Sequence, residues 1–503
     1  MTNEHISRRR FLAGAAAVGA TAVFGNSLLA QQVANTQQLC FLPRLSRPRD
    51  DQRPNIITLI LDTLRSDHVG FYGNPTIQTP HIDAFAAQSQ VFDRMYSGGF
   101  PTLLNRAELF TGRYMYTVMN WGDLPDDAVV MADILNRAGY TTGLVFDNWH
   151  LKDEGFFLDR GFQSWDWVRG QEGDRFRAQP RSPQLPASPE KFRDVEQVRQ
   201  YLRNMEGRQT EADYLVAQTM MRSVSWLERN MDYGPFYLHV DVFDPHEPWD
   251  PPQSYVDLYD PGYTGEQIIS PAYAPPDYLS AAELNHVRAL YAAEVSLTDR
   301  WVGYFLEELE RLGLMDNTIV MLFSDHGFML GEHEAIGKAW SRSGYYEAYP
   351  LYEELVHVPL MVRVPGQPHR RNSALVQPAD IMPTVLDLAA AADPGTMHGK
   401  SLRAMLEGAG EPVREVAVSG RSLLLSLSSK NRLNVTDGEW VLFHGAAHAS
   451  SHLYYLPDDP QQQNDLLGVE CTRAKQMHGQ LIAFLQTIET PDEYIAQWLT
   501  PPC

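Results

Sequence analysis

The chain has 503 residues, which is long enough for one large domain together with a smaller one. Its hydrophobic content of 44% and its charged content of 21% are typical of a globular protein. The 63 acidic residues outnumber the 41 basic residues, and the net charge of −22 argues against nonspecific binding to nucleic acid. An anionic substrate would therefore need a local cluster of positive groups.

Residues 1–30 have the composition of an export signal. The stretch SRRRFLAGAAAVGATAVF at positions 7–24 sets a twin arginine ahead of an Ala- and Gly-rich apolar run, and it resembles a twin-arginine signal peptide. This run is weak for a membrane span, and no later stretch approaches about 20 apolar residues. We therefore predict export by the twin-arginine machinery to the periplasm or beyond, with a basic disordered start as the alternative. Residues 31–52 are polar and are interpreted as a linker.

The three cysteines, Cys40, Cys471 and Cys503, lie toward the ends of the chain. Export into an oxidising compartment would allow disulfides. A bridge between Cys471 and Cys503 is one pairing that the sequence allows but does not determine.

Four continuous apolar runs end in polar residues that can carry chemistry. They are NIITLILD, YTTGLVFDNWH, PFYLHVDVFDPHEPW and TIVMLFSDHGF, and they end at Asp62, at Asp147 and His150, at Asp244 and His246, and at Asp325 and His326. Apolar runs without alternation are typical of parallel strands that helices cover on both faces. A single strand followed by Asp is usually only a turn or a helix cap, but four of them indicate one shared edge. Ligands of such sheets bind beyond the carboxyl ends of the strands.

Helical patterns at 79–92, 129–139 and 292–313 alternate with these runs, so the predicted class is α/β with a mostly parallel sheet between helices. The pattern then changes to antiparallel strands within 432–444 and 451–460, followed by an amphipathic helix at 473–488. A hairpin turn is predicted at Asp437 and Gly438, within the first of these segments. We therefore predict a catalytic domain and a small C-terminal α+β subdomain with an antiparallel sheet, at residues 53–395 and 396–503.

Asp62, Asp325 and His326 supply two carboxylates and an imidazole from two strand ends, as expected for one divalent cation. Oxygen ligands suit Ca²⁺, Mg²⁺ or Mn²⁺, whereas the imidazole favours Mn²⁺ or Zn²⁺. Ca²⁺ is our first expectation and the other three are alternatives. A second complete metal site is not visible in the sequence.

Thr102 stands just before a helix that we expect to begin near Asn105, where an ordinary N-cap is the alternative to a catalytic role. A helix N-terminus stabilises negative charge. Arg106 lies four residues further on, on the same helix face, and could reach the nucleophile or the ester oxygens.

His150, His246 and Lys338 could hold the remaining ester oxygens, and one histidine could protonate the leaving alcohol. Each of the three could also be an ordinary loop or surface residue.

The segment GGFPTLLNRAELFTGRY at 98–114 resembles the sulfatase signature, and the resemblance to sulfatases of the alkaline phosphatase superfamily extends over residues 53–470. Three other stretches resemble the same family: RPNIITLILDTLRSDHVGFYG, FSDHGFMLGEHEAIGKAW and HLYYLPDDPQQQNDLL. The resemblance implies an alkaline-phosphatase-like fold and a sulfuric ester hydrolase. It also implies metal ligands at Asp62, Asp325 and His326, and active-site roles for Arg106, His150, His246 and Lys338.

Three positions depart from the family pattern. Thr63 stands where many sulfatases have a second Asp, so its hydroxyl would be a weaker metal ligand, and Asn148 stands where a lysine is usual. Thr102 replaces the Cys or Ser that sulfatases oxidise to formylglycine. A threonine cannot give this aldehyde because its Cβ carries a methyl group, so Thr102 would have to attack the ester directly. Similar sets with a Thr nucleophile occur in phosphodiesterases and phosphotransferases of the superfamily.

Three functions therefore remain open. The first is a metal-dependent hydrolase of sulfate esters that acts on a small anionic ester or a sulfated glycan. The second is a phosphodiesterase, phosphonate monoester hydrolase or phosphotransferase that uses Thr102. The third is a noncatalytic protein that binds anionic esters. Long loops at 176–192 and 247–278 are expected to determine the substrate.

Overall fold

The computed structural model describes residues 52–152, 156–178, 182–342, 345–424, 431–446 and 450–503. Residues 50–503 form one compact unit. The predicted export signal and Cys40 lie outside the described residues, and the boundary at residue 395 stays a prediction. No helix in the described part of the chain is long and apolar enough to cross a membrane.

The main sheet has eight strands, of which only β11 runs against its neighbours. The strands follow the order β12 (Arg370–Val376), β2 (Gln90–Tyr96), β11 (His357–Arg363), β6 (Thr318–Ser324), β1 (Asn55–Leu61), β5 (Phe236–Val242), β3 (Thr141–Phe146) and β4 (Ser164–Trp167). The four apolar runs of the sequence are β1, β3, β5 and β6, and they pair in parallel at the centre of this sheet. The predicted α/β class with a mostly parallel sheet is confirmed.

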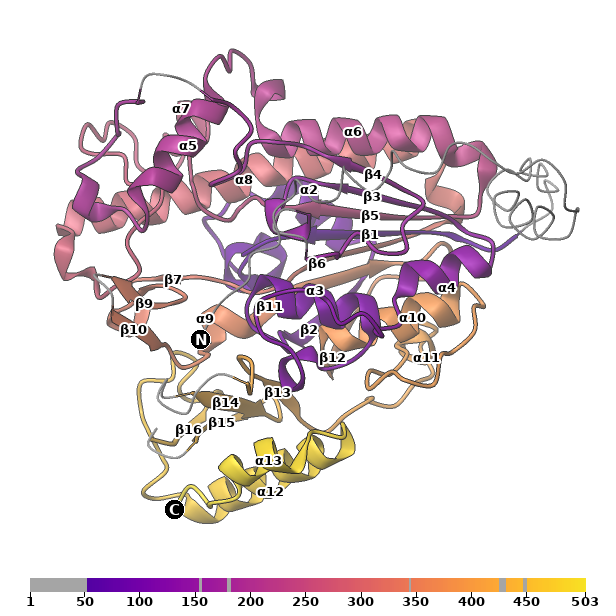
Figure 1. The fold of residues 1–503 in the computed structure, drawn as a ribbon, viewed down its shortest axis with the longest axis vertical. Coiled ribbons are helices and arrows are strands. Elements are labelled where there is room, and N and C mark those ends of the chain that lie inside the picture. Colours follow the sequence, from indigo (N-terminus) through magenta and orange to yellow (C-terminus); the bar gives the residue numbers. More distant parts are fainter. Residues whose placement is uncertain (1–51, 153–155, 179–181, 343–344, 425–430, 447–449) are drawn as a thin grey trace, which may run out of the picture. The chain divides into compact units, whose positions relative to one another are not determined.

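Helices cover both faces of the sheet (Figure 1). Along β1, Ile57, Leu59 and Leu61 pack in one apolar cluster, whereas Ile56 and Ile60 pack in another. Central strands are therefore mainly apolar, because neither face meets water. The first cluster includes residues of α2 (Pro80–Ala86), α6 (Leu215–Asn230) and α8 (Ala281–Arg311), and the second includes residues of α3 (Thr102–Thr111), α4 (Met131–Arg137) and α10 (Ile381–Leu388).

Further helices and small strands lie outside the main sheet. The helices are α5 (Val195–Met205), α7 (Gln253–Val256), α9 (Glu353–Val356), α11 (Arg403–Leu406) and α13 (Asp492–Ile495), and the small strands are β7 (Met329–Leu330), β8 (Ile336–Gly337), β9 (Ala339–Arg342) and β10 (Tyr345–Ala348).

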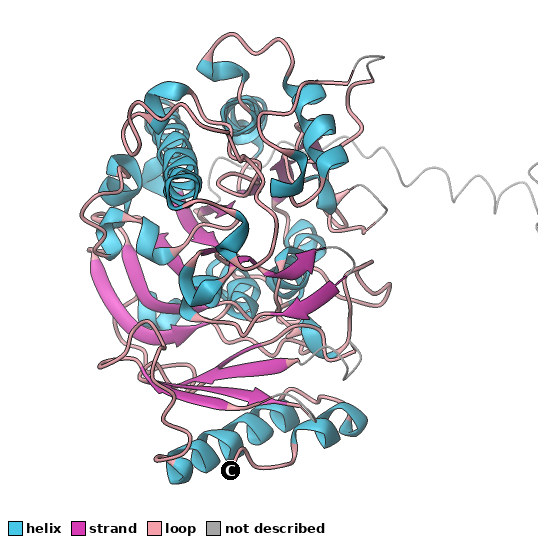
Figure 2. Cartoon of the chain, turned by 90° about the vertical axis from the view of Figure 1, so that its left-hand side faces the viewer, coloured by secondary structure: helices cyan, strands magenta, loops and turns pink. Residues whose placement is uncertain are grey.

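The C-terminal segment forms its own antiparallel sheet, as predicted, from β13 (Ala417–Ser419), β14 (Arg432–Thr436), β15 (Trp440–Gly445) and β16 (His452–Tyr455). Helix α12 (Cys471–Thr487) lies along this sheet (Figure 2). A disulfide joins Cys471 to Cys503 and so makes the pairing that the sequence left open.

Two expected boundaries differ from the structure. The helix expected over 79–92 ends at Ala86, and β2 begins at Gln90, because the backbone of β2 pairs with β11 on one side and β12 on the other. Helix α3 begins at Thr102 rather than near Asn105, and its N-cap is Pro101.

A close approach fixes the loop between β2 and α3. Gly98 and Gly99 lie against the carboxylate of Glu108, and a Cβ at Gly98 would lie 2.0 Å from Glu108 Oε2. A side chain at Gly98 would therefore have to displace the Glu108 carboxylate where this loop turns toward the start of α3.

Candidate functional site

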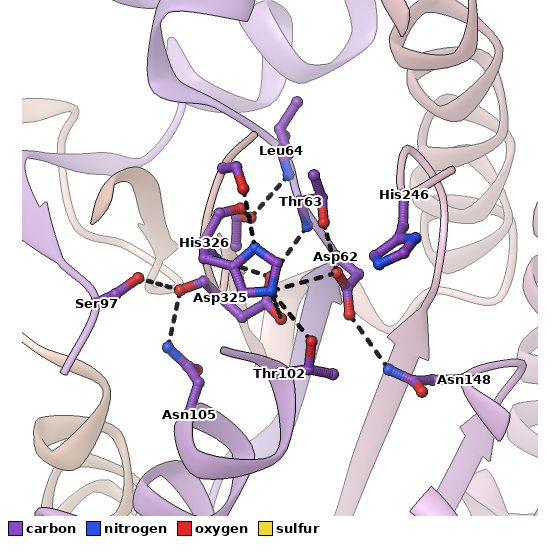
Figure 3. Close-up of polar contacts among 12 residues, drawn as sticks. Asp62, Thr63, Leu64, Ser97, Thr102, Asn105, Asn148, His246, Asp325 and His326 are labelled. Carbon is purple, nitrogen blue, oxygen red and sulfur yellow. Dashed lines mark hydrogen bonds and ion pairs between the residues drawn. The ribbon is translucent and has the colours of Figure 1, made fainter. Parts of the chain in front are cut away.

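Asp62, Thr102, Asp325 and His326 meet at the carboxyl edge of the sheet (Figure 3). Asp62 follows β1, and Asp325 and His326 follow the adjacent parallel strand β6. The metal-ligating atoms of Asp62, Asp325 and His326 all lie within 4.8 Å of one another, and all three residues are buried. The strand ends thus bring together the three residues that the sequence singled out for a cation.

The imidazole of His326 is oriented by the backbone. Its Nδ1 lies 3.1 Å from the carbonyl oxygen of Gly327, so Nδ1 carries the proton and the Nε2 lone pair faces the site. Nε2 lies 3.1 Å from Thr102 Oγ1 and 3.5 Å from Asp325 Oδ2. Burial lowers the pKa of His326 to about 3, which keeps the imidazole neutral and able to bind a metal.

The hydroxyl of Thr102 bonds to a residue of the site and does not cap helix α3. Pro101 is the N-cap of α3, and no side-chain cap bond is present there. Thr102 Oγ1 makes its hydrogen bond with His326 Nε2, and in this contact the hydroxyl can donate to the neutral ring. Thr102 thus presents a hydroxyl at a helix N-terminus and is not an ordinary cap.

Thr63 adopts a left-handed backbone conformation, with φ of 67°, that is uncommon for a β-branched residue. Its amide donates to Asp325 Oδ1 at 3.0 Å, and its hydroxyl donates to Asp62 Oδ1 at 2.8 Å. The strained turn therefore orients both carboxylates. In this geometry the hydroxyl of Thr63 acts as a donor to a candidate ligand.

Arg106 is fully buried among three carboxylates. Its guanidinium makes two bonds to Asp241, at 2.7 Å and 2.9 Å, contacts Asp62 at 3.0 Å and also contacts Asp325. It reaches Thr102 through a long bond of 3.4 Å to the backbone carbonyl. Arg106 thus binds the carboxylates around the candidate metal position, whereas the sequence led us to expect that it would reach the nucleophile or the ester.

Asp241 is a buried partner that we did not predict from the sequence. It lies within β5, where a charge in an otherwise apolar strand signals a buried partner. Burial alone would raise the pKa of Asp241, but Arg106 and His239 lower it below the ordinary value. Arg106 and Asp241 therefore form a buried ion pair.

Asn148, at the position where a lysine is usual, donates to Asp62 Oδ2 at 3.2 Å. Its side-chain oxygen accepts the amide of His150. The amide thus supports one of the candidate metal ligands without adding positive charge.

The charges of this cluster fit a divalent cation. The carboxylates of Asp62, Asp241 and Asp325 share the single guanidinium of Arg106, and Lys338 is the other cation that acts on Asp62. Burial and the nearby Asp325 raise the pKa of Asp62 well above its ordinary value. A cation held by two carboxylates and a neutral imidazole would relieve this crowding.

A cavity of about 510 Å³ opens above this cluster. Thr102, His150, His246 and Lys338, which are four of the five predicted catalytic residues, line it. Arg106 lies behind the cavity wall and has no exposed surface. The predicted residues thus separate into a lining group and a supporting group.

Comparisons with known proteins show the family of the chain. The sulfatase family pattern matches residues 54–391, and the pattern described as N-sulphoglucosamine sulphohydrolase, C-terminal, matches residues 341–489. The chain belongs to the sulfatase family.

Two relatives illustrate the level of similarity within this family. The chain is 26% identical over 426 residues to the ulvan-active sulfatase of Formosa agariphila, an alignment that covers 83% of this chain and 77% of that protein. It is 23% identical over 502 residues to the N-acetylglucosamine-6-O-sulfatase of Bacteroides thetaiotaomicron, which covers 83% of each.

Two solved structures share the fold. One is the phosphonate monoester hydrolase of Agrobacterium radiobacter, with a TM-score of 0.67, 20% identity and coverage of 89% of this chain and 96% of that one. The other is a protein in complex with its own substrate, D-glucosamine-2-N,6-O-disulfate. Its TM-score is 0.67 and its identity is 20%, with coverage of 88% of this chain and 99% of that one. At this identity the likeness shows the fold alone.

Lys338 and His246 are both buried in the wall of the sulfatase-family cavity. Burial lowers the pKa of the Lys338 amine, although Glu247 and Asp62 act in the opposite direction. Burial and then Lys338 lower the pKa of His246 well below its ordinary value. His246 Nδ1 lies 2.6 Å from the carbonyl oxygen of Glu247, so its Nε2 lone pair is left as an acceptor.

Glu172, Glu247 and Arg193 form a second charged group beside His246, and none of the three was predicted from the sequence. Arg193 lies 3.3 Å from Glu247 and 3.7 Å from Glu172. Glu172 also lies 3.5 Å from His150 Nε2. These residues come from loops, whose paths the strand-end pattern does not predict.

Asp147 and Asp244 end their strands as expected but do not join the metal ligands. Gln171 donates to both, at 3.3 Å and 3.1 Å. Burial raises the pKa of Asp244 to about 6. This acidic pair therefore belongs to the packing beneath the loops.

Proposed function

We propose that the protein is an exported, metal-dependent hydrolase of sulfate esters in which Thr102 is the nucleophile. The observation that carries this proposal is the hydroxyl of Thr102 in the cavity wall, 3.1 Å from the neutral His326. An ordinary helix cap would not direct this hydroxyl into a cavity.

Asp62, Asp325 and His326 would hold one divalent cation, with Ca²⁺ as the first choice and Mn²⁺, Mg²⁺ or Zn²⁺ as alternatives. When bound, such a cation supplies positive charge that polarises the ester. Thr63, Asn148 and the other partners described above fix the orientation of the ligands.

The cavity residues can supply both the attacking hydroxyl and the proton transfers of the proposed reaction. Thr102 Oγ1 forms a bond to sulfur as the bond between sulfur and the alcohol oxygen breaks, and the proton that Thr102 loses is the one that the alcohol requires. Lys338 would bind oxygens of the sulfuryl group. His246 and His150 are the groups that can carry the proton, and water then hydrolyses the sulfated Thr102.

The substrate class that we propose is a sulfated sugar. The support is the sulfatase family membership and the relatives named for N-acetylglucosamine 6-sulfate and ulvan. Export to the periplasm or beyond rests on the twin-arginine pattern, and the Cys471–Cys503 disulfide is consistent with an oxidising compartment.

A second candidate is a phosphonate monoester hydrolase or phosphodiesterase that uses the same nucleophile. The identity of Thr102 favours it, because a threonine cannot be oxidised to formylglycine. A noncatalytic binding protein is the third candidate, and the intact set of lining residues argues against it.

The test compares metal-loaded wild type, Thr102→Ala and Thr102→Ser on an aryl sulfate, a phosphate monoester, a phosphodiester and a phosphonate monoester. We expect sulfate ester turnover in the wild type, a loss of about 100-fold or more in Thr102→Ala, and partial retention in Thr102→Ser, because serine keeps the hydroxyl. Intact mass measurement after a rapid quench should detect one added sulfuryl group on the wild type.

Each different outcome selects among the alternatives. Dominant phosphonate or phosphodiester turnover that disappears in Thr102→Ala would establish the second candidate. Sulfate turnover that survives Thr102→Ala would refute Thr102 as the nucleophile. Inactivity on all four classes in protein that contains its metal would favour the binding protein.

A further inference from the structure

Arg421 is a buried arginine in the wall of the catalytic cavity, and the chemistry proposed above does not use it. Arg421 is 5% exposed, and it lines the same cavity as Thr102, His246 and Lys338. Its guanidinium donates to the backbone carbonyl of Lys338, but its Nε has no hydrogen-bond partner within the described residues. No ion pair of Arg421 is present in that part of the chain either.

The fold places this guanidinium close to the nucleophile. Gly420 pairs with Gly99 as an isolated bridge, and the amide of Phe100 donates to the carbonyl of Gly420 at 2.9 Å. Arg421 therefore follows directly after a backbone contact with the loop that leads into Thr102. The Arg421 guanidinium also lies over the Phe100 ring, 4.5 Å from its centroid, and this contact fixes its plane.

Two other arginines of this chain, the buried Arg106 and the more exposed Arg193, behave differently. Arg106 binds three carboxylates, and Arg193 binds Glu247 and Glu172. Burial opposes the charge of these arginines too, but their carboxylates raise the pKa of each guanidinium. At Arg421 burial lowers the pKa, and no carboxylate among the described residues offsets this effect.

A buried cation without a carboxylate partner is costly unless a ligand pairs with it. The planar guanidinium matches the paired oxygens of a carboxylate or a sulfate. The sulfuryl group that is cleaved already has Lys338 and the proposed metal position. A second acidic group on the substrate would give Arg421 the ion-pair partner that the described residues do not supply.

We propose that Arg421 binds a second acidic group of the substrate, either a carboxylate or a second sulfate, beside the ester that is cleaved. This inference rests on the proposed function and makes the preferred substrate a sulfated sugar with at least two anionic groups. Arg421 is then a specificity residue of the cavity.

The test measures equilibrium binding to metal-loaded Thr102→Ala protein, so that turnover does not enter. The probes are N-acetylglucosamine 6-sulfate with one anionic group, glucosamine-2-N,6-O-disulfate with two sulfates, and a disaccharide of glucuronate and N-acetylglucosamine 6-sulfate with one sulfate and one carboxylate. We expect at least one two-anion probe to bind about 10-fold tighter than the one-anion probe. Comparison of the two-anion probes tells the sulfate from the carboxylate.

Adding Arg421→Gln should remove this difference by weakening only the two-anion probe, and Arg421→Lys should restore part of it. Arg342→Gln is the matched control, because Arg342 lies outside the cavity, where it donates to the carbonyl of Glu190 and lies over Tyr278. It should leave all affinities unchanged.

Two results would overturn the inference. Equal weakening of one-anion and two-anion probes by Arg421→Gln would show that the guanidinium binds the cleaved group. Absence of tighter binding by either two-anion probe would show that no second acidic group is recognised. If the binding difference is present but the wild type turns over no sulfate ester, the proposed function fails and the binding inference stands.

Discussion

At the scale of single residues, the site depends on one guanidinium. Arg106 neutralises part of the charge of Asp62, Asp241 and Asp325 without touching the cavity. Its contribution is therefore to lower the pKa of the candidate metal ligands Asp62 and Asp325 against the effect of burial, and to hold both in place. Removal of one member of such a buried group leaves charge without compensation.

We predict that Arg106→Met lowers the free energy of unfolding by about 3–5 kcal/mol, because three buried carboxylates lose their shared partner. Chemical denaturation of the apo protein measures this loss. Arg106→Lys keeps the charge and should lose less. A stability of Arg106→Met equal to that of the wild type would contradict the prediction.

At the scale of elements, the strand ends could be predicted from the sequence, because a polar residue directly after a fully apolar run marks where a buried strand reaches the edge of its sheet. Asp62, Asp325 and His326 followed from this pattern, and Thr102 and Lys338 followed from the resemblance to a family. The supporting loops could not be predicted in the same way. Arg193 and Arg421 reach the cavity through the tertiary path of loops, which no local periodicity encodes.

The end of α2 shows a second limit. The sequence TPHIDAFAAQSQVF keeps a helical pattern of apolar residues, yet the helix ends at Ala86. Pairing of β2 with β11 and β12 decides the conformation from Gln90 onward. Tertiary pairing thus overrides a local pattern.

The junction between α2 and α8 should make stability depend on pH. Asp299 of α8 accepts the amides of His81 and Ile82 at the start of α2, at 3.2 Å and 2.7 Å. Burial raises the pKa of Asp299 to about 7. Between the unfolded pKa near 3.9 and this value, the folded state binds the proton that the unfolded state has lost.

We therefore predict that the stability of the wild type relative to Asp299→Asn falls as pH rises from 5 to 7, by up to about 1.4 kcal/mol per pH unit. Urea denaturation of both proteins across this range measures the difference. Ala84→Ser, an exposed change in the same helix without a titratable group, should show a difference that does not change with pH. A constant difference for Asp299→Asn would refute the raised pKa.

At the scale of the whole molecule, the C-terminal sheet and α12 are linked covalently as well as by packing. The Cys471–Cys503 disulfide spans 32 positions and ties the chain end to the first residue of α12. Neither cysteine lines the catalytic cavity. The bridge should therefore affect stability and leave the chemistry unchanged.

We predict that Cys471→Ser with Cys503→Ser lowers the free energy of unfolding by about 2–4 kcal/mol, because the unfolded chain gains freedom. The kcat of the folded protein should be unchanged at 25 °C. A reducing agent should lower the Tm of the wild type and leave that of the double variant unchanged. Equal stability of the oxidised wild type and the double variant would contradict this.

The β-bridge between the backbones of Gly99 and Gly420 also determines how late during synthesis the cavity can form. Thr102, the proposed nucleophile, leaves the ribosome early, whereas another part of its cavity wall, at Arg421 and Ser422, is translated more than three hundred residues later. A nascent chain that has released Thr102 but not residue 422 therefore lacks part of the cavity wall. The cavity is complete only after this residue has been released, so we expect no hydrolysis by a shorter nascent chain.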